Sequence, residues 1–183
     1  MIKIIIGTSG TGKTTFTNYM FGEENSLVSI TSREKRQGEI EGKDYYYIDR
    51  KTFESLIDSK IVFEYTEYAN NYYGLTIDEV KRQLKNPKAY VIMDYNGAKQ
   101  LIELLNKWNE SYTILYFQAD YDTIKERMTL RGDSPDSIEK RLKQYYIDEE
   151  NNKILLTQDN VVLINANLSF EEVISKYKYI SQL

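Results

Sequence analysis

The segment that most constrains this chain is the glycine-rich octapeptide GTSGTGKT at residues 7–14. It follows an apolar run at residues 2–6, which predicts a buried strand, and it opens a predicted helix at residues 13–21. The octapeptide matches G-x-x-x-x-G-K-[ST], which in this context forms a phosphate-binding loop because backbone N–H groups and a helix N-terminus converge on anionic oxygens. An ordinary glycine turn is the alternative, but motif and context together favour phosphate binding.

The side chains of the octapeptide suit a nucleotide. The ammonium group of Lys13 would contact β- and γ-phosphates, and the hydroxyl group of Thr14 would ligate Mg²⁺. The candidate nucleotide-binding residues are Gly7, Ser9, Gly10, Thr11, Gly12, Lys13, Thr14 and Thr15. The loop does not identify the group that receives the phosphate.

Composition narrows the chemistry. The chain has no histidine and no cysteine, which excludes Ser-His and Cys-His hydrolases, disulfides and thiolate metal sites. The net charge of −4 argues against a nucleic acid partner, and no apolar run approaches the roughly 18 residues that span a bilayer. We therefore expect a cytoplasmic protein whose partners are small-molecule nucleotides, with neither nucleic acid nor membrane among them.

Apolar runs and helix-like stretches alternate along most of the chain. Strands are predicted at residues 2–6, 27–30, 90–93, 113–117 and 161–164, and later helices at residues 97–108, 121–130, 137–152 and 170–182. This alternation is typical of an α/β fold with a mostly parallel five-stranded sheet between helical layers.

One segment interrupts the alternation. Residues 31–76 are charged and tyrosine-rich, and their pattern predicts short antiparallel strands around one helix at residues 51–60. We interpret this segment as a small lobe inserted into a single domain, whose core comprises residues 1–30 and 77–183.

Three motifs in this segment resemble the guanylate kinase family. Residues 31–45 read TSREKRQGEIEGKDY, close to the family's T-T-R-x-x-R-x-G-E-x-x-G-x-D-Y, and are followed by FEY at 63–65 and NYYG at 71–74. The resemblance covers nearly the whole chain. It implies a P-loop kinase three-layer sandwich with an inserted mixed α/β lobe that binds a monophosphate, and a helical lid at about residues 131–141.

The resemblance also implies the acceptor site. The acceptor phosphate would be held by Ser29, Arg33, Arg36, Tyr45 and Tyr73. Guanidinium forks and hydroxyl donors suit a dianionic phosphate. Glu64 would accept hydrogen bonds from the two donors on the guanine edge. A solvated charged loop is the alternative for Arg33 and Arg36 taken alone.

The chain departs from the family where the base would bind. Leu75 stands where the family has a serine or threonine that donates to guanine O6, with Thr76 one residue later as a substitute if the loop shifts. The family's D-[IV]-[DE]-x-Q-G segment reads DYNG at residues 94–97, which puts Asn96 in place of a carboxylate. Each lost contact weakens discrimination between bases, so guanine specificity is expected to be reduced.

Further candidates lie on the donor side. Asp94 follows the apolar run at residues 90–93, at the carboxyl end of a strand, where it would help hold Mg²⁺ beside Thr14; a helix N-cap is the alternative. The resemblance also implies that three lid arginines, Arg127, Arg131 and Arg141, reach the donor phosphates and the transition state. The alternative is that these arginines belong to a solvated helix face. Asn165 aligns with an asparagine near the donor adenine.

The predicted function is ATP-dependent phosphorylation of a nucleoside monophosphate, GMP or dGMP first, with ATP as the donor, Mg²⁺ as the cofactor, and Lys13, Asp94 and the lid arginines as catalytic residues. A family kinase that acts on another nucleoside monophosphate or on a phosphorylated sugar is one alternative, and a non-catalytic guanylate-kinase-like binding module is another. The predicted assembly is a monomer or a weak homodimer.

Overall fold

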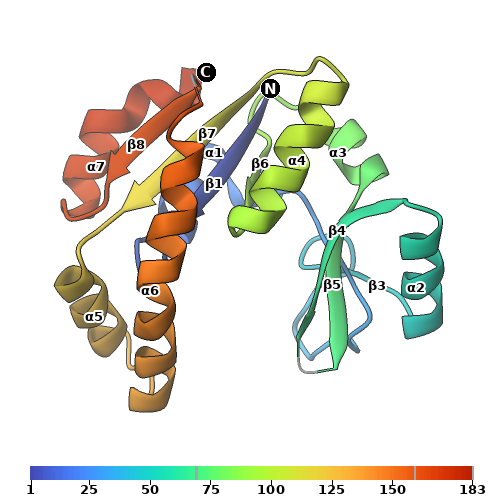
Figure 1. Ribbon diagram of the computed structural model, residues 1–183, viewed down its shortest axis with the longest axis horizontal. Helices are drawn as coiled ribbons and strands as arrows, with labels where there is room; N and C mark the ends of the chain where they lie inside the picture. The colour runs from blue at the N-terminus through green and yellow to red at the C-terminus, as the bar shows by residue number, and fades with distance from the viewer. Residues whose placement is uncertain (69, 159, 183) are drawn as a thin grey trace.

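The computed structural model describes residues 1–68, 70–158 and 160–182, which form two sheets and the helices around them (Figure 1). The core sheet contains β1 (Ile2–Gly7), β6 (Tyr90–Ile92), β7 (Tyr112–Gln118) and β8 (Val161–Asn165) in the order β6-β1-β7-β8. All three pairings between these strands are parallel. The carboxyl ends of the strands therefore meet at one edge, next to the glycine-rich loop.

Helices cover both faces of the core sheet. Alternate residues of β1 enter different apolar clusters, Ile4 on one face and Ile5 on the other. The Ile4 face carries α4 (Tyr95–Lys107) and the later part of α6 (Pro135–Leu155), and the Ile5 face carries α1 (Lys13–Phe21) and α7 (Phe170–Tyr177). This confirms the predicted three-layer α/β fold and explains why β1 is apolar without alternation.

The strand expected at residues 27–30 is present only in a reduced form, beside β6. Ser26 makes a single parallel bridge to Tyr90, and the N–H of Leu27 donates to the Tyr90 carbonyl at 2.8 Å. The chain then leaves β6, because Ile30 and Thr31 form β2 (Ile30–Thr31) of the second sheet.

The second sheet lies within the segment expected to be a lobe. It contains β2, β3 (Tyr46–Tyr47), β4 (Val62–Tyr68) and β5 (Asn71–Thr76) in the order β3-β2-β5-β4. The β2–β5 and β4–β5 pairs are antiparallel as expected, whereas β2–β3 is parallel. The helix α2 (Arg50–Asp58) covers this sheet and buries Phe53 fully.

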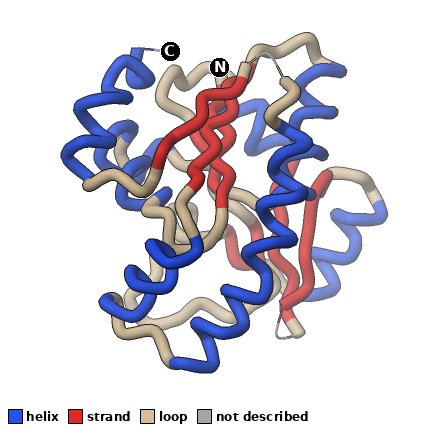
Figure 2. Tube along the Cα trace, turned by 60° about the vertical axis from the view of Figure 1, so that its left-hand side comes forward, coloured by secondary structure: helices blue, strands red, loops and turns tan. Residues whose placement is uncertain are grey.

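Two parts of the molecule project beyond the carboxyl edge of the core sheet. Figure 1 shows the second sheet with α2 on one side, and α5 (Tyr121–Leu130) with the first half of α6 on the other. The tube in Figure 2 shows α5 and α6 joined by a tight turn at the far end of this projection. The segment expected to be a lid, residues 131–141, comprises that turn and the first turns of α6.

Helix bounds agree with the sequence patterns to within a few residues, with one omission. The sequence did not predict α3 (Ile77–Gln83), which follows β5 directly. Two 3-10 helices, η1 (Glu23–Asn25) and η2 (Lys178–Gln182), complete the fold. No helix within the described residues combines the length and apolar character needed to cross a membrane.

Candidate active site

The glycine-rich loop between β1 and α1 has a backbone that demands glycine. Gly7 has φ +135°, and a Cβ there would lie 2.3 Å from the Phe117 carbonyl oxygen on β7. Gly12 has φ +83° and precedes the first residue of α1. Both conformations strain any other residue, so the glycine pattern reflects the shape of the loop.

Lys13 points back into this loop. Its Nζ donates to the carbonyl oxygens of Gly7 and Thr8, at 2.7 Å each. Burial lowers the pKa of Lys13 to about 8, although the negative charge of Asp148 on α6 opposes this shift. The ammonium group is therefore held at the centre of the loop, where a bound phosphate would meet it.

Three arginines from α5, α6 and the turn between them converge on the loop. Arg127, Arg131 and Arg141 line a cavity of about 380 Å³ together with Ser9, Gly10, Gly12, Lys13, Thr14 and Thr15. Each guanidinium group has a different partner: Arg127 donates to the carbonyls of Ala166 and Leu168, Arg131 pairs with Asp133, and Arg141 donates to the Ser9 hydroxyl. The cavity is strongly cationic and thus suited to a polyphosphate.

A second, largely apolar cavity of about 290 Å³ adjoins the first and shares Gly12, Thr15 and Arg127 with it. Its wall includes Thr11 and the rings of Phe16, Phe117 and Phe170. Asn165 is not part of this wall; its side chain accepts from the N–H of Asn167. A phosphate cavity beside an apolar one matches the two halves of a nucleoside triphosphate.

The second sheet carries a separate cationic cavity of about 410 Å³. The structure brings together four of the predicted acceptor-site residues in the lining of this cavity, Arg33, Arg36, Tyr45 and Tyr73, and Glu39 joins them. The rings of Tyr45 and Tyr73 lie 5.7 Å apart, edge to face. Ser29 does not line this cavity, because it precedes β2, where its carbonyl accepts from the N–H of Tyr46 at 2.9 Å.

Sequence reasoning missed Glu39 as part of this cavity. Its carboxylate accepts from Arg33 at 2.7 Å, from the backbone N–H of Arg36 and from the Tyr47 hydroxyl at 2.8 Å each. These bonds, chiefly that from Arg33, lower the pKa of Glu39 to about 2. The sequence does contain a signal for this residue, because Glu39 is the acidic member of the Gly-Glu pair in the arginine-rich motif at residues 31–45.

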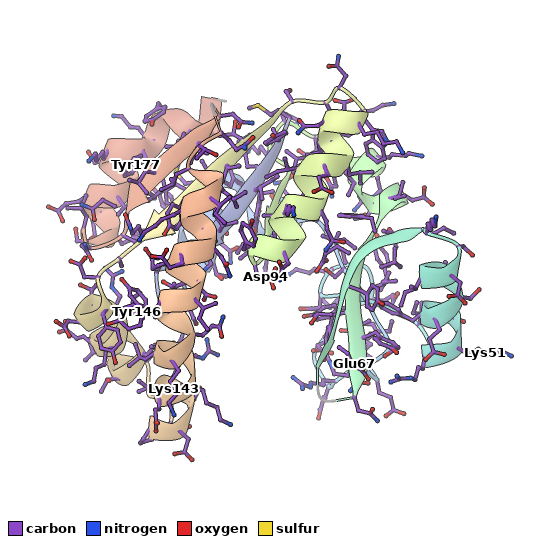
Figure 3. All side chains as sticks on the ribbon, in the orientation of Figure 1. Lys51, Glu67, Asp94, Lys143, Tyr146 and Tyr177 are labelled. Atoms are coloured by element: carbon purple, nitrogen blue, oxygen red, sulfur yellow. The ribbon has the colours of Figure 1, made fainter. Side chains whose placement is uncertain are left out.

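Glu64 lies on β4 where the second sheet meets the start of α4. Burial, assisted by the negative charge of Asp94, raises the pKa of Glu64 to about 7. Figure 3 shows Asp94 at the end of α4 from which that helix begins. Two carboxyl groups thus face the same small region from different elements.

The other predicted base-site residues have separate roles in the fold. Leu75 pairs with Glu64 in the sheet register, but its side chain is buried among the core residues of α3 and α4. The hydroxyl of Thr76 caps α3 by accepting from the N–H of Glu79, so it is already engaged. Asn96 is exposed in the first turn of α4. The structure therefore brings Glu64 and Asp94 together but leaves Leu75 in the core.

Asp94 is the N-cap of α4. One carboxylate oxygen accepts from the N–H of Gly97 at 2.9 Å, which satisfies an otherwise unpaired helix donor. The alternative interpretation of Asp94 is thus correct at the level of local structure. Asp94 does not line the cavity that contains Thr14.

Comparisons with known proteins agree with this geometry. The family model for guanylate kinase matches residues 2–179. The guanylate kinase of Oceanobacillus iheyensis is 32% identical, with 98% of this chain and 94% of the relative aligned, and that of Bacillus subtilis is 27% identical, with 97% and 95% aligned. The crystal structure of guanylate kinase from Anaplasma phagocytophilum, at 22% identity, superposes with a TM-score of 0.65 over 100% of this chain and 84% of that one. A family match over nearly the full length, with the glycine-rich loop intact, shows that this chain belongs to the guanylate kinase family.

Proposed function

We propose that this chain transfers the γ-phosphoryl group of ATP to GMP or dGMP, producing ADP and GDP or dGDP. The observation that carries the proposal is the presence of two cationic cavities on separate elements, one at the glycine-rich loop and one on the second sheet. Two anionic substrates would occupy them at the same time. The relatives named guanylate kinase support this assignment.

On the donor side, loop N–H groups and Lys13 bind the β- and γ-phosphates, and the arginines of α5 and α6 stabilise the charge that develops during transfer. The apolar cavity beside Phe16 and Phe117 accommodates the nucleoside. Arg127 joins the two, because it borders both cavities and holds the loop after β8 through Ala166 and Leu168.

Mg²⁺ would bind at the hydroxyl group of Thr14, which is exposed at the start of α1 in the phosphate cavity. The described residues contain no group of three acidic, histidine or cysteine side chains placed to hold a cation, so nucleotide oxygens would complete its ligands. When bound, the ion neutralises charge on the β- and γ-phosphates. Asp94 would attract the ion electrostatically without being one of its direct ligands.

On the acceptor side, Arg33, Arg36, Tyr45 and Tyr73 hold the monophosphate, with Ser29 joining them if the lobe moves. Glu64, as a carboxylate, accepts from the guanine edge. An oxygen of the acceptor phosphate attacks the γ-phosphorus, and the bond from that phosphorus to the β–γ bridging oxygen breaks. This oxygen is already anionic, so positioning suffices and no general base is required.

A kinase of this family with a different acceptor, another nucleoside monophosphate or a phosphorylated sugar, is the second candidate. It is favoured by the base site, where Leu75 is committed to the core and Asn96 presents an amide. The acceptor site would then keep its phosphate contacts and change its preference for the base.

A panel of monophosphates with ATP and Mg²⁺, followed through ADP release, tests the proposal. Rapid release with GMP or dGMP supports it; release only with another acceptor selects the second candidate, and no release with any acceptor contradicts both.

We further propose a single domain that works in the cytoplasm, with the lobe at residues 31–76, the lid at 131–141 and the core in the remainder. We also propose that the protein is a monomer or a weak homodimer, which light scattering would test.

A further inference from the structure

The turn between α5 and α6 pairs a lid arginine with a carboxylate two residues later. Arg131 Nε donates to Asp133 Oδ1 at 2.8 Å, and Nη2 donates to Oδ2. Gly132 makes this close pairing possible with φ +83°, and the N–H of Asp133 donates to the Met128 carbonyl at 3.1 Å. The backbone of the turn therefore fixes the position of the carboxylate.

The pairing leaves one edge of the guanidinium group available. A guanidinium carries five N–H donors, and Asp133 takes those on the Nε–Nη2 edge. The Nη1–Nη2 edge retains donors that match a phosphate bidentately. Arg131 lines the phosphate cavity, whereas the Asp133 carboxylate, 15% exposed, lines the groove between α5 and α6 on the other side of the turn.

The other two arginines of the cavity are held differently. Arg127 is anchored by the neutral carbonyls of Ala166 and Leu168, and Arg141 by the hydroxyl of Ser9. Within the described part of the chain, Arg131 is the member of this trio that is ion-paired. A carboxylate so close to a polyphosphate site repels the ligand, and this disadvantage is offset if the carboxylate orients the arginine.

We propose that Asp133 is a positioning residue that holds Arg131 with its free edge toward the donor phosphates. This inference rests on the proposed kinase function. Without Asp133, the long side chain of Arg131 would sample many rotamers, and the edge would face the cavity only part of the time.

The test is a double-mutant cycle of Asp133→Asn and Arg131→Ala, measured as kcat and as KM for ATP and GMP. Asp133→Asn keeps the size of the side chain and removes its charge. We expect Asp133→Asn to lower kcat/KM for ATP by about 10-fold or more, the loss typical of a charge-assisted hydrogen bond, and to leave KM for GMP unchanged. In the Arg131→Ala background, the same change should alter neither value.

A matched control is Glu139→Gln, which removes another lid carboxylate, one that lines the same groove as Asp133 but pairs with Lys143 on α6. It should leave kinetics unchanged. Additive effects in the cycle, or a faster enzyme after Asp133→Asn, would overturn the proposal, and thermal melting checks that each variant is folded. Calorimetry with a non-hydrolysable ATP analogue repeats the cycle without turnover, so the role of Asp133 is still measured if no monophosphate is phosphorylated and the proposed function fails.

Discussion

The carboxylate of Glu64 lies directly against Gly97, where a Cβ built on the glycine would come within 3.4 Å of Glu64 Oε1. The first turn of α4 therefore closes over a carboxyl group carried by the second sheet. Asp94, the N-cap of the same helix, adds a second negative charge beside it. This arrangement explains the raised pKa of Glu64 and leads to two predictions.

The first prediction concerns acceptor binding. The proposed contact with guanine requires the ionised form of Glu64, whose pKa of about 7 means that protons compete with the base near neutrality. The KM for GMP should therefore rise as pH falls through 7, while the KM for ATP stays constant. In Glu64→Gln this acid limb should disappear together with most of the affinity for GMP. An acid limb that survives in Glu64→Gln would assign it to another group.

The second prediction concerns stability without ligand. The folded pKa of Glu64, about 7, lies above its ordinary value of 4.5, so its contribution is fully present below pH 4.5 and is lost as pH rises through 7. Glu64→Gln removes this loss. Its melting temperature should therefore exceed that of the native protein at pH 8 and match it at pH 4.5. Equal differences at both pH values would show that the charge has no role.

The third prediction separates the two cavities. Lys13→Ala should reduce transfer by about 10²-fold or more, because a charge at the transferred phosphate is lost, but should leave GMP binding intact. Lys13→Met keeps the apolar part of the side chain and removes only the charge, so it should give the same result as Lys13→Ala. Since burial lowers the pKa of Lys13 to about 8, the native KM for ATP should also rise above that pH. Calorimetry that shows equal loss of both ligands would contradict this separation.

The fourth prediction concerns Arg36. Its side chain is exposed, and within the described residues no ion pair holds its guanidinium group, so its removal should not affect folding. Arg36→Ala should raise the KM for GMP and lower kcat, with kcat/KM falling about 10- to 100-fold, the equivalent of about 1.5–3 kcal/mol for a charged contact. Lys35→Ala, a neighbouring exposed cation, is the control. Unchanged kinetics for Arg36→Ala would reduce the segment to a charged surface.

The fifth prediction concerns the base. Glu64 should keep GMP preferred over AMP, but the discrimination should be weaker than in a relative that has the family's hydroxyl and second acid, by about 1–3 kcal/mol for each missing contact. Asn96→Asp, at an exposed position, should sharpen discrimination without a cost in stability. The measurement is kcat/KM for GMP, dGMP, AMP, dAMP and pyrimidine monophosphates. The hypothesis of weakened discrimination would be wrong if the native protein already phosphorylated only guanine nucleotides and Asn96→Asp left its kcat/KM values unchanged.

Much of the fold could be predicted because local and global signals agree. The continuous apolar run of β1 predicts a strand that is covered on both faces, and the glycines that follow it predict a phosphate-binding loop. The four-residue spacing of Arg127 and Arg131 predicts that both side chains lie on one side of a helix, and both line the same cavity. The helix α3 was missed because it has only seven residues and follows β5 without a connecting turn.

The remaining features depend on contacts that no local pattern encodes. Glu39 enters the cationic cavity of the second sheet because Arg33 pairs with it, and Leu75 enters the core because β5 runs on into α3. The two interpretations of Asp94, helix cap and metal-side acid, use the same side chain, and only the hydrogen bond to Gly97 reveals the first.

Leu75 couples the proposed base site to the stability of the core. It is 2% exposed and packs in the same cluster as Val80, Ala98 and Leu101, yet it sits in the strand that pairs with Glu64. Leu75→Ser would leave a cavity, and comparable truncations of buried leucine cost about 2–5 kcal/mol. A serine at position 75 would therefore need a larger neighbour on α3 or α4 to fill that space. A change of contacts at the base site is therefore inseparable from a repacking of the core.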